Sequence, residues 1–242
     1  MPRKKKIIPI NITIDDAGSG NFAGGMLIAA YAEEIKSYTS AVIQPEEYND
    51  ISVDMQTKVF NAVDLILSTY SCLEYEIESV FLCQSNLFDS TTYHLIDRGY
   101  IVIRGRVEGE LQNIIEDDFI KHLQSFGMPE YLKFYLKMIE RDKNLGYRLL
   151  NNFCINFVKV DLKNRLKFCK SHNKLFDDLQ KTVLDREKME NVFLKKPKLC
   201  CECGKYIFDN TLYKFVTVGF NSVFYGHCSC IDKIEKNINS NV

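Results

Sequence analysis

Long apolar runs are missing from this sequence. No stretch of its 242 residues is apolar for long enough to span a membrane. The basic residues 3–6 are not followed by an apolar segment of the signal-peptide type, which argues against secretion. Internal repeats and low-complexity tracts are also absent. These absences favour a globular protein of the cytoplasm, with one core or one core plus a small satellite domain, that does not act at a membrane.

A disulfide framework is not predicted, although the sequence contains 9 cysteines. The four cysteines outside the C-terminal region all stand alone, and those near the C-terminus are spaced like metal ligands. This pattern favours a reducing cytoplasm. The isolated cysteines are Cys72, Cys83, Cys154 and Cys169. Either Cys201 or Cys228 is a further cysteine that the metal-ligand spacing does not require.

The net charge of −1 combines two parts of opposite sign. Residues 1–130 carry 10 Lys and Arg against 20 Asp and Glu, which gives −10. Residues 131–242 carry 21 against 12, which gives +9. An acidic part beside a basic part is compatible with metal-binding carboxylates next to a polyanion-binding surface. The simpler alternative is that these charges only solvate the surface.

Hydrophobic periodicity predicts an α/β domain in the first half of the chain. Alternation indicates strands, and a spacing of three to four residues indicates helices. The predicted order is β-β-β-α-β-α-β-α, a three-stranded meander followed by units that need parallel crossovers. Residues 128 to about 195 are predicted to be mostly helical and basic. The predicted strands are 8–16, 26–32, 40–44, 78–83 and 100–107, and the predicted helices are 54–70, 91–97 and 110–126.

Two adjacent carboxylates, Asp15 and Asp16, end the first predicted strand. Like charges side by side repel each other unless a cation relieves them. Mg²⁺ prefers one or two protein carboxylates completed by water and substrate phosphate, and two such ions can activate water to attack a phosphodiester. The alternative is that one aspartate caps the following glycine turn and the other is solvated.

Two further acids are candidates for the same site. Asp89 lies just beyond the fourth predicted strand, which should lie beside the first. Asp118 falls within the apolar stripe of the helix 110–126, one turn before His122. A carboxylate that faces a sheet needs a partner or a metal. The alternative is that Asp118 lies at the edge of the stripe and reaches water.

The segment Asp15 to Gly25 resembles the front hairpin of the type 2 ribonucleases H. Their motif reads D-E-A-G-R-G-x-x-A-G-P before an apolar strand. The predicted element order is also similar to that of the wider ribonuclease H-like superfamily, whose enzymes cut or join nucleic acid with Mg²⁺ or Mn²⁺. The matching residues are Asp15, Ala17, Gly18, Gly20, Ala23 and Gly24, with Asp16 in place of glutamate.

The resemblance implies a catalytic metal site and a nucleic-acid contact. Asp15, Asp16 and Asp89 would be its ligands, with Asp118 as a fourth by position. The family's glycine loop contacts the nucleic-acid backbone, which implies contacts from residues 18–20. Two features depart from the family: a serine replaces the loop arginine, and the Ser-Lys motif expected after the third strand is absent. The loop residues are Gly18, Ser19 and Gly20.

The C-terminal cysteines predict a structural zinc site. Cys200 and Cys203 have the spacing of a zinc knuckle, and His227 and Cys230 form the second pair. Two strands around Gly219 and a helix from Ile231 would complete a finger similar to a treble clef. Four nitrogen and sulfur ligands close a tetrahedral Zn²⁺ site. Cys201 and Cys228 remain alternative ligands, and a set of buried reduced cysteines is the alternative to a metal site.

Lysines and arginines crowd the stretch 159–174. Cations at this density can neutralise phosphates along a nucleic acid. The alternative is an amphipathic helix with a solvated face. The candidates for nucleic-acid contact are Lys163, Arg165 and Lys167.

These patterns predict three domains and an enzyme. A ribonuclease H-like domain would span 7–128, a basic helical extension 129–196 and a zinc finger 197–238. The predicted activity is metal-dependent hydrolysis of phosphodiesters in RNA, DNA or a hybrid. The main alternative is a domain of the same fold that binds nucleic acid or assembles a complex without catalysis.

Overall fold

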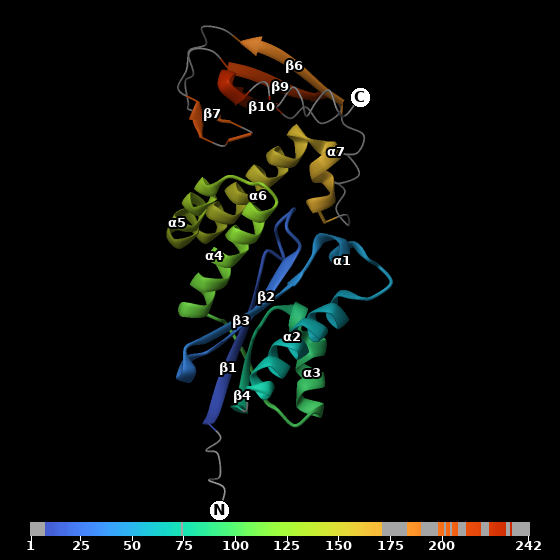
Figure 1. The fold of residues 1–242 in the computed structure, drawn as a ribbon, viewed down its shortest axis with the longest axis vertical. Helices are drawn as coiled ribbons and strands as arrows, with labels where there is room; N and C mark the ends of the chain where they lie inside the picture. Colours follow the sequence, from blue (N-terminus) through green and yellow to red (C-terminus); the bar gives the residue numbers. More distant parts are fainter. Residues whose placement is uncertain are drawn as a thin grey trace, which may run out of the picture. The chain divides into compact units, whose positions relative to one another are not determined.

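The computed structural model describes residues 8–73, 75–170, 183–189, 198–200, 202–203, 205–207, 212–218, 223–230 and 233 (Figure 1). The chain divides into two compact units. Unit 1 contains residues 1–20 and 25–119, and unit 2 contains residues 21–24 and 120–242. Among the described residues, no helix has the length and apolar character needed to cross a membrane.

Unit 1 is built around a mixed five-stranded sheet, as the sequence predicted. The strands are β1 (Ile8–Ala17), β2 (Met26–Ala32), β3 (Ser37–Ile43), β4 (Tyr75–Cys83) and β5 (Ile101–Gly105). Their order across the sheet is β3-β2-β1-β4-β5. The pairs β1–β2 and β2–β3 are antiparallel, whereas β1–β4 and β4–β5 are parallel. The meander and the parallel crossovers are therefore both present.

Helices follow the strands of unit 1 in the predicted order, with one additional short helix, Pro45–Asn49, that was not predicted. They are α1 (Pro45–Asn49), α2 (Met55–Cys72), α3 (Asp89–Asp97) and the first part of α4 (Glu110–Ser125), whose residues from 120 onward belong to unit 2; short 3₁₀ turns lie at Glu33–Ile35 and Asn86–Phe88. The main core forms where α2 and α3 cover one face of the sheet (Figure 1). Alternating β1 residues meet the apolar stripe of α2 there, which is the burial that the two periodicities predict. This core includes Ile10, Ile12, Ile14, Val59, Val63, Ile66 and Leu95.

Unit 2 begins with helices. They are a 3₁₀ turn (Glu130–Leu132), α5 (Lys133–Arg141), α6 (Lys143–Val160), α7 (Leu162–Arg165) and a second 3₁₀ turn (Leu166–Phe168). Asp142 caps α6 by accepting a hydrogen bond of 3.0 Å from Leu145 N. Residues 21–24 also belong to this unit, and backbone hydrogen bonds join them to it: Lys170 N donates to Phe22 O at 3.0 Å and Gly24 N donates to Phe168 O at 2.9 Å.

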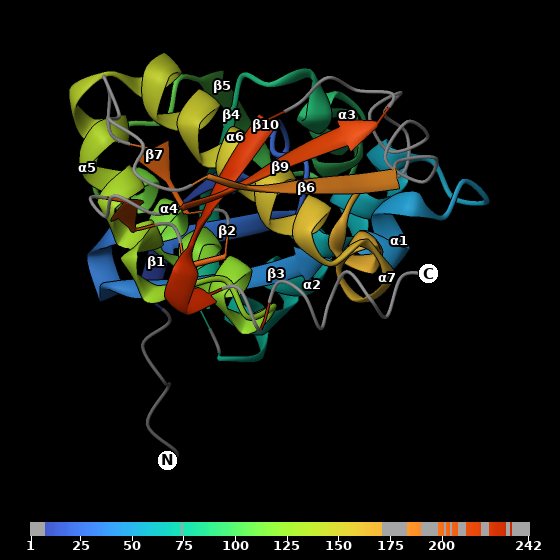
Figure 2. The ribbon, with the colours of Figure 1, turned by 90° about the horizontal axis from the view of Figure 1, so that it is seen from above.

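Short strands complete unit 2. They are β6 (Val183–Met189), β7 (Lys198–Leu199), β8 (Tyr206–Ile207), β9 (Leu212–Val218) and β10 (Val223–His227), followed by a 3₁₀ turn at Cys228–Cys230. The strands β10, β9 and β6 form one sheet, in which β6 runs alongside β9 (Figure 2). The β9–β10 hairpin was predicted. The helical prediction is wrong for 183–189, because pairing with β9 supplies this segment's backbone hydrogen bonds.

Candidate metal centres

The carboxyl ends of β1 and β4 bring the first candidate site together. These strands are parallel neighbours, and Ile14 is paired with Leu82, so the next residues along them are Asp15 and Cys83. Ile14 is fully buried, and the alternation of a strand turns Asp15 to the opposite face. Asp15 is nevertheless only 8% exposed. A buried carboxylate at this position needs polar partners.

Asp15, Asp16 and Cys83 form a group with metal-binding geometry. One ligand atom from each lies within 4.8 Å of the others. Asp16 N donates a hydrogen bond of 2.9 Å to Asp15 Oδ1, which fixes the two aspartates relative to each other. We refer to these three residues as the carboxylate group. The sequence prediction included both aspartates and missed Cys83, which carries no motif and is recognised only from the strand register.

The negative charges of Asp15 and Asp16 affect the pKa values of nearby side chains. Burial raises the pKa of the Cys83 thiol to about 11, and a hydrogen bond with Asp15 and the charges of both aspartates act in the same direction. The thiol is therefore protonated at neutral pH. Burial also raises the pKa of Tyr48, and the charge of Asp16 adds to this effect. A divalent cation at this place would relieve the repulsion between the two aspartates.

Asp118 and Asp89 lie outside the carboxylate group. Asp118, on α4, accepts a hydrogen bond of 2.9 Å from the Tyr38 hydroxyl. Burial raises the pKa of Tyr38, and this hydrogen bond raises it further. Asp89 begins α3 and forms an ion pair of 3.2 Å with Arg104 Nη1. Neither aspartate is part of a group of three or more potential metal ligands among the described residues.

The predicted glycine loop directly follows β1. Gly18 has φ of +82°, and a Cβ built on it would lie 2.2 Å from Phe119 Cε2. The backbone at this position therefore requires glycine. Gly20 has no atom within 4 Å of a built Cβ, and Ser19 between them is partly exposed. The loop thus has one glycine set by the fold and one that leaves open space next to the backbone.

The second candidate site lies at the ends of the short strands in unit 2. Cys200, Cys203, His227 and Cys230 each place a ligand atom within 4.8 Å of the others, which is close enough to hold a metal ion. We refer to these four residues as the cysteine–histidine cluster. Cys200 follows β7, and its N donates to Lys205 O at 2.9 Å, which closes the knuckle with β8. His227 ends β10, and Cys230 ends the following turn.

Hydrogen bonds around the cluster orient its ligands. His227 Nδ1 lies 3.3 Å from Cys203 Sγ, and His227 Nε2 lies 3.1 Å from Tyr206 O. With the proton on Nε2, the ring donates to this carbonyl and directs the lone pair of Nδ1 to the thiols. Histidine ligands of metals are oriented in the same way. The donor set of three sulfurs and one nitrogen is one of the sets that structural Zn²⁺ sites use.

Backbone groups surround the sulfur of Cys200 with donors. Burial raises the pKa of this thiol, but hydrogen bonds from the backbone of Cys203, His227 and Glu202 outweigh burial and lower the pKa to about 7. The His227 N to Cys200 Sγ distance is 3.5 Å. Burial raises the pKa of Cys230 to about 12. The knuckle therefore favours a thiolate at Cys200 before any metal is considered.

The alternative ligands fall outside the part of the chain that the structure describes. Cys201 is not among the described residues, and only the backbone of Cys228 is described. Apart from Lys233, the predicted helix from Ile231 also lies outside the described residues, as does the turn at Gly219.

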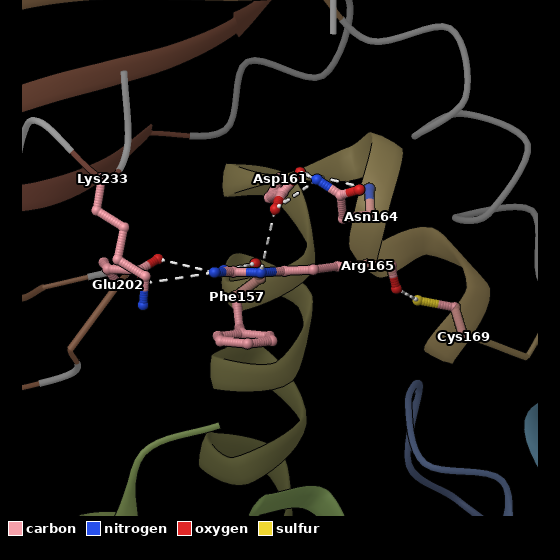
Figure 3. A network of polar contacts seen from close by, with 7 residues as sticks. All are labelled: Phe157, Asp161, Asn164, Arg165, Cys169, Glu202 and Lys233. Atoms are coloured by element: carbon pink, nitrogen blue, oxygen red, sulfur yellow. Dashed lines mark hydrogen bonds and ion pairs between the residues drawn. The ribbon is translucent and has the colours of Figure 1, made fainter. Parts of the chain in front are cut away.

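The basic residues that were predicted to contact nucleic acid lie in different environments. Arg165 is 7% exposed and pairs with Glu202 and Asp161 (Figure 3). Lys167 is exposed, and its Nζ lies 5.3 Å from the centre of the Phe168 ring. The side chain of Lys163 is not described. Glu202, the partner of Arg165, was not singled out in the sequence, since a charged residue within a knuckle gives no sign of where its side chain points.

Comparison with known proteins does not place this chain in a family. No protein-family model matches the sequence, and no curated protein matches it.

Proposed function

We propose that unit 1 is a ribonuclease H-like domain that hydrolyses phosphodiester bonds of nucleic acid with Mg²⁺ or Mn²⁺ at the carboxylate group. The observation that carries this proposal is the position of Asp15 and Asp16 at the end of β1, the central strand of the order β3-β2-β1-β4-β5. The hairpin motif, in which six residues match the type 2 ribonucleases H, supports it independently. Ligands of open α/β sheets are commonly found beyond the carboxyl ends of strands.

The chain's own residues have separate roles in this proposal. Asp15 and Asp16 would hold the cation, which when bound activates water and stabilises the leaving oxygen of the phosphodiester. The protonated Cys83 thiol is a poor ligand for Mg²⁺, so the two carboxylates carry the binding. The open backbone at Gly20 gives room for a phosphate next to the loop. RNA, DNA and hybrids are all candidate substrates.

Cleavage assays with Mn²⁺ on single strands, duplexes, hybrids and junctions test the proposed activity. Asp15→Asn keeps the shape of the side chain and removes its charge, so we expect cleavage to fall at least about a hundredfold. Asp97→Asn is the matched control, because Asp97 is an exposed acid at the end of α3. Equal cleavage by Asp15→Asn and the wild type would exclude this site.

A second function, nucleic-acid binding without catalysis, is favoured by a specific observation. Two of the four aspartates expected at the site have partners elsewhere, Asp89 with Arg104 and Asp118 with Tyr38. An enzyme of the superfamily would need a third or fourth carboxylate near the metals. Gel-shift experiments on the same substrates distinguish the two functions: binding without cleavage in Mn²⁺, unchanged by Asp15→Asn, supports the second.

We also propose that the cysteine–histidine cluster binds one structural Zn²⁺. The support is the fit of the four donors, the carbonyl partner of His227 and the backbone donors to Cys200. The local core is small, centred on Cys200 and Ile207, so a metal would supply much of its stability. Metal analysis of the purified protein should give one zinc per chain, and Cys203→Ser should lose it. Full zinc content in Cys203→Ser would contradict this ligand set.

A further inference from the structure

Glu202 links the zinc knuckle to the helices of unit 2. It stands between Cys200 and Cys203, and its backbone N–H hydrogen-bonds the Cys200 sulfur. Its side chain, only 4% exposed, leaves the knuckle toward α7 (Figure 3). There Glu202 Oε2 lies 3.1 Å from Arg165 Nη2, and Oε1 lies 3.4 Å from the same nitrogen. One residue therefore contacts both a metal ligand and a helix.

Arg165 is fixed by the end of α6 as well as by Glu202. Its Nη1 donates a hydrogen bond of 2.8 Å to Phe157 O, one of the last carbonyls of the helix, which lack partners within the helix. Its guanidinium carbon lies 3.7 Å from the centre of the Phe157 ring, a cation–π contact. Its Nε lies 3.8 Å from Asp161 Oδ2. Arg165 thus ties the C-terminal turn of α6 to the knuckle.

The local turn around Arg165 is independently ordered. Asp161 accepts hydrogen bonds of 3.3 and 2.9 Å from Asn164 N and Nδ2, which caps the short helix α7. Cys169 Sγ lies 3.8 Å from Arg165 O. The guanidinium is therefore presented to Glu202 by a backbone held on both sides of residue 165.

The Arg165–Glu202 pair is buried, so water cannot readily take the place of either partner. The side chains of Arg165 and Asp161 are each 8% exposed, and that of Glu202 is 4% exposed. Lys233 also contacts Glu202, but its side chain is 66% exposed and is screened by solvent. Loss of Arg165 would remove a buried cation from two nearly buried carboxylates, those of Asp161 and Glu202. Breaking a buried pair by removing one partner is strongly unfavourable.

We propose that the Arg165–Glu202 pair positions the knuckle for metal binding, so that zinc affinity at the cysteine–histidine cluster and the stability of the α6–α7 junction are coupled. The inference rests on the proposed zinc site. Arg165 is a positioning residue that acts through Glu202 and does not itself contact the metal. Coupling of this kind is reciprocal: zinc stabilises the junction by the same free energy by which the intact junction strengthens zinc binding.

Zinc affinity of the full-length protein tests this coupling. The variants are Arg165→Met, which removes the charge and keeps an unbranched side chain over Phe157, and Glu202→Gln, which is nearly isosteric. Arg148→Met is the matched control, because it makes the same change at an exposed position of α6. Competition with a colorimetric chelator gives the affinity, and hydrogen exchange of residues 157–165 with and without zinc gives the stability of the junction.

We expect Arg165→Met and Glu202→Gln each to weaken zinc binding by at least about tenfold, in the range found for residues that orient metal ligands. The control should stay within about twofold. Zinc should slow exchange at 157–165 in the wild type and have a smaller effect in Glu202→Gln, the variant to use if Arg165→Met does not fold. A wild type that binds zinc, with variants of unchanged affinity, overturns the coupling. A wild type that binds no zinc overturns the proposed zinc site itself.

Discussion

His122 is a half-buried titratable side chain whose charge bears on stability. Its Nε2 lies 2.9 Å from Gly24 O, and its ring contacts Phe126 edge-on at 4.7 Å between centroids. Burial lowers the pKa of His122, and the hydrogen bond with Gly24 O only partly offsets this. The folded protein therefore holds the neutral ring at pH values where the unfolded chain is already protonated.

The stability of the fold should decrease as the pH falls through the unfolded value of 6.5. The unfolded chain binds a proton in this range before the folded protein does, so protonation favours unfolding. Urea unfolding at pH 7.5 and pH 5.5 measures the change. We expect His122→Gln to lose less stability on acidification than the wild type, whereas His94→Gln, a change at an exposed histidine, should behave like the wild type. An equal loss of stability in the wild type and in His122→Gln would show that His122 does not cause this pH dependence.

Asp118 shows how far a single residue can be interpreted from the sequence. Its place in the apolar stripe of α4 predicts that the carboxylate needs a partner or a metal. The partner in the structure is the Tyr38 hydroxyl on β3, 80 positions away in the sequence. Periodicity identifies the requirement, but the identity of the partner depends on tertiary packing. The same holds for Cys83, whose place beside Asp15 depends on the register of β1 and β4.

At the scale of elements, the loop after β1 gives a direct test of backbone geometry. Gly18 has a positive φ and lies against Phe119, whereas Gly20 has open space around it. We expect Gly18→Ala to destabilise the protein by about 1–3 kcal/mol, from left-handed backbone strain and the clash with the ring. Gly20→Ala should stay within about 0.5 kcal/mol. Urea unfolding of both variants provides the comparison, and equal effects would exclude the proposed difference.

Most elements of unit 1 could be predicted because each carries its own hydrophobic pattern, whereas the short helix α1 was missed. The alternation in β1, the apolar run of β2 and the stripes of α2 and α4 gave the type of each element and bounds within a few residues. β6 could not be predicted in this way. Its sequence, Val-Leu-Asp-Arg-Glu-Lys-Met, has four consecutive charged residues and no sustained alternation, and it becomes a strand by pairing with β9. Whether such an edge segment forms a strand depends on the strand with which it pairs.

At the scale of the whole molecule, the two candidate centres belong to different units. The carboxylate group lies in unit 1 and the cysteine–histidine cluster in unit 2. Chelation of zinc should therefore lower hydrogen-exchange protection within unit 2, in 198–200, 205–207, 212–218 and 223–227 and at the α6–α7 junction, residues 157–165. Protection of the paired segments of β1 and β4 should be retained. Parallel loss of protection in the five-stranded sheet would show instead that the whole fold depends on the zinc site.

The spacing of the cysteine–histidine cluster could be predicted from the sequence, since two pairs of ligands at knuckle spacing are visible along the chain. The carboxylate group could be predicted only in part. Adjacent aspartates at a strand end identify part of the group, whereas Cys83 is distant in the sequence and joins them only through the register of β1 and β4. Asp89 and Asp118 were expected to converge on the same site, but they pair with Arg104 and Tyr38 and lie outside the carboxylate group.

The most direct test of the proposed catalytic site is a crystal structure of the full-length protein soaked in Mn²⁺, with anomalous data that distinguish manganese from zinc. We predict manganese about 2.1 Å from carboxylate oxygens of Asp15 and Asp16, and zinc within the cysteine–histidine cluster. Manganese elsewhere in the crystal, with none at Asp15 and Asp16, would contradict the proposed catalytic site.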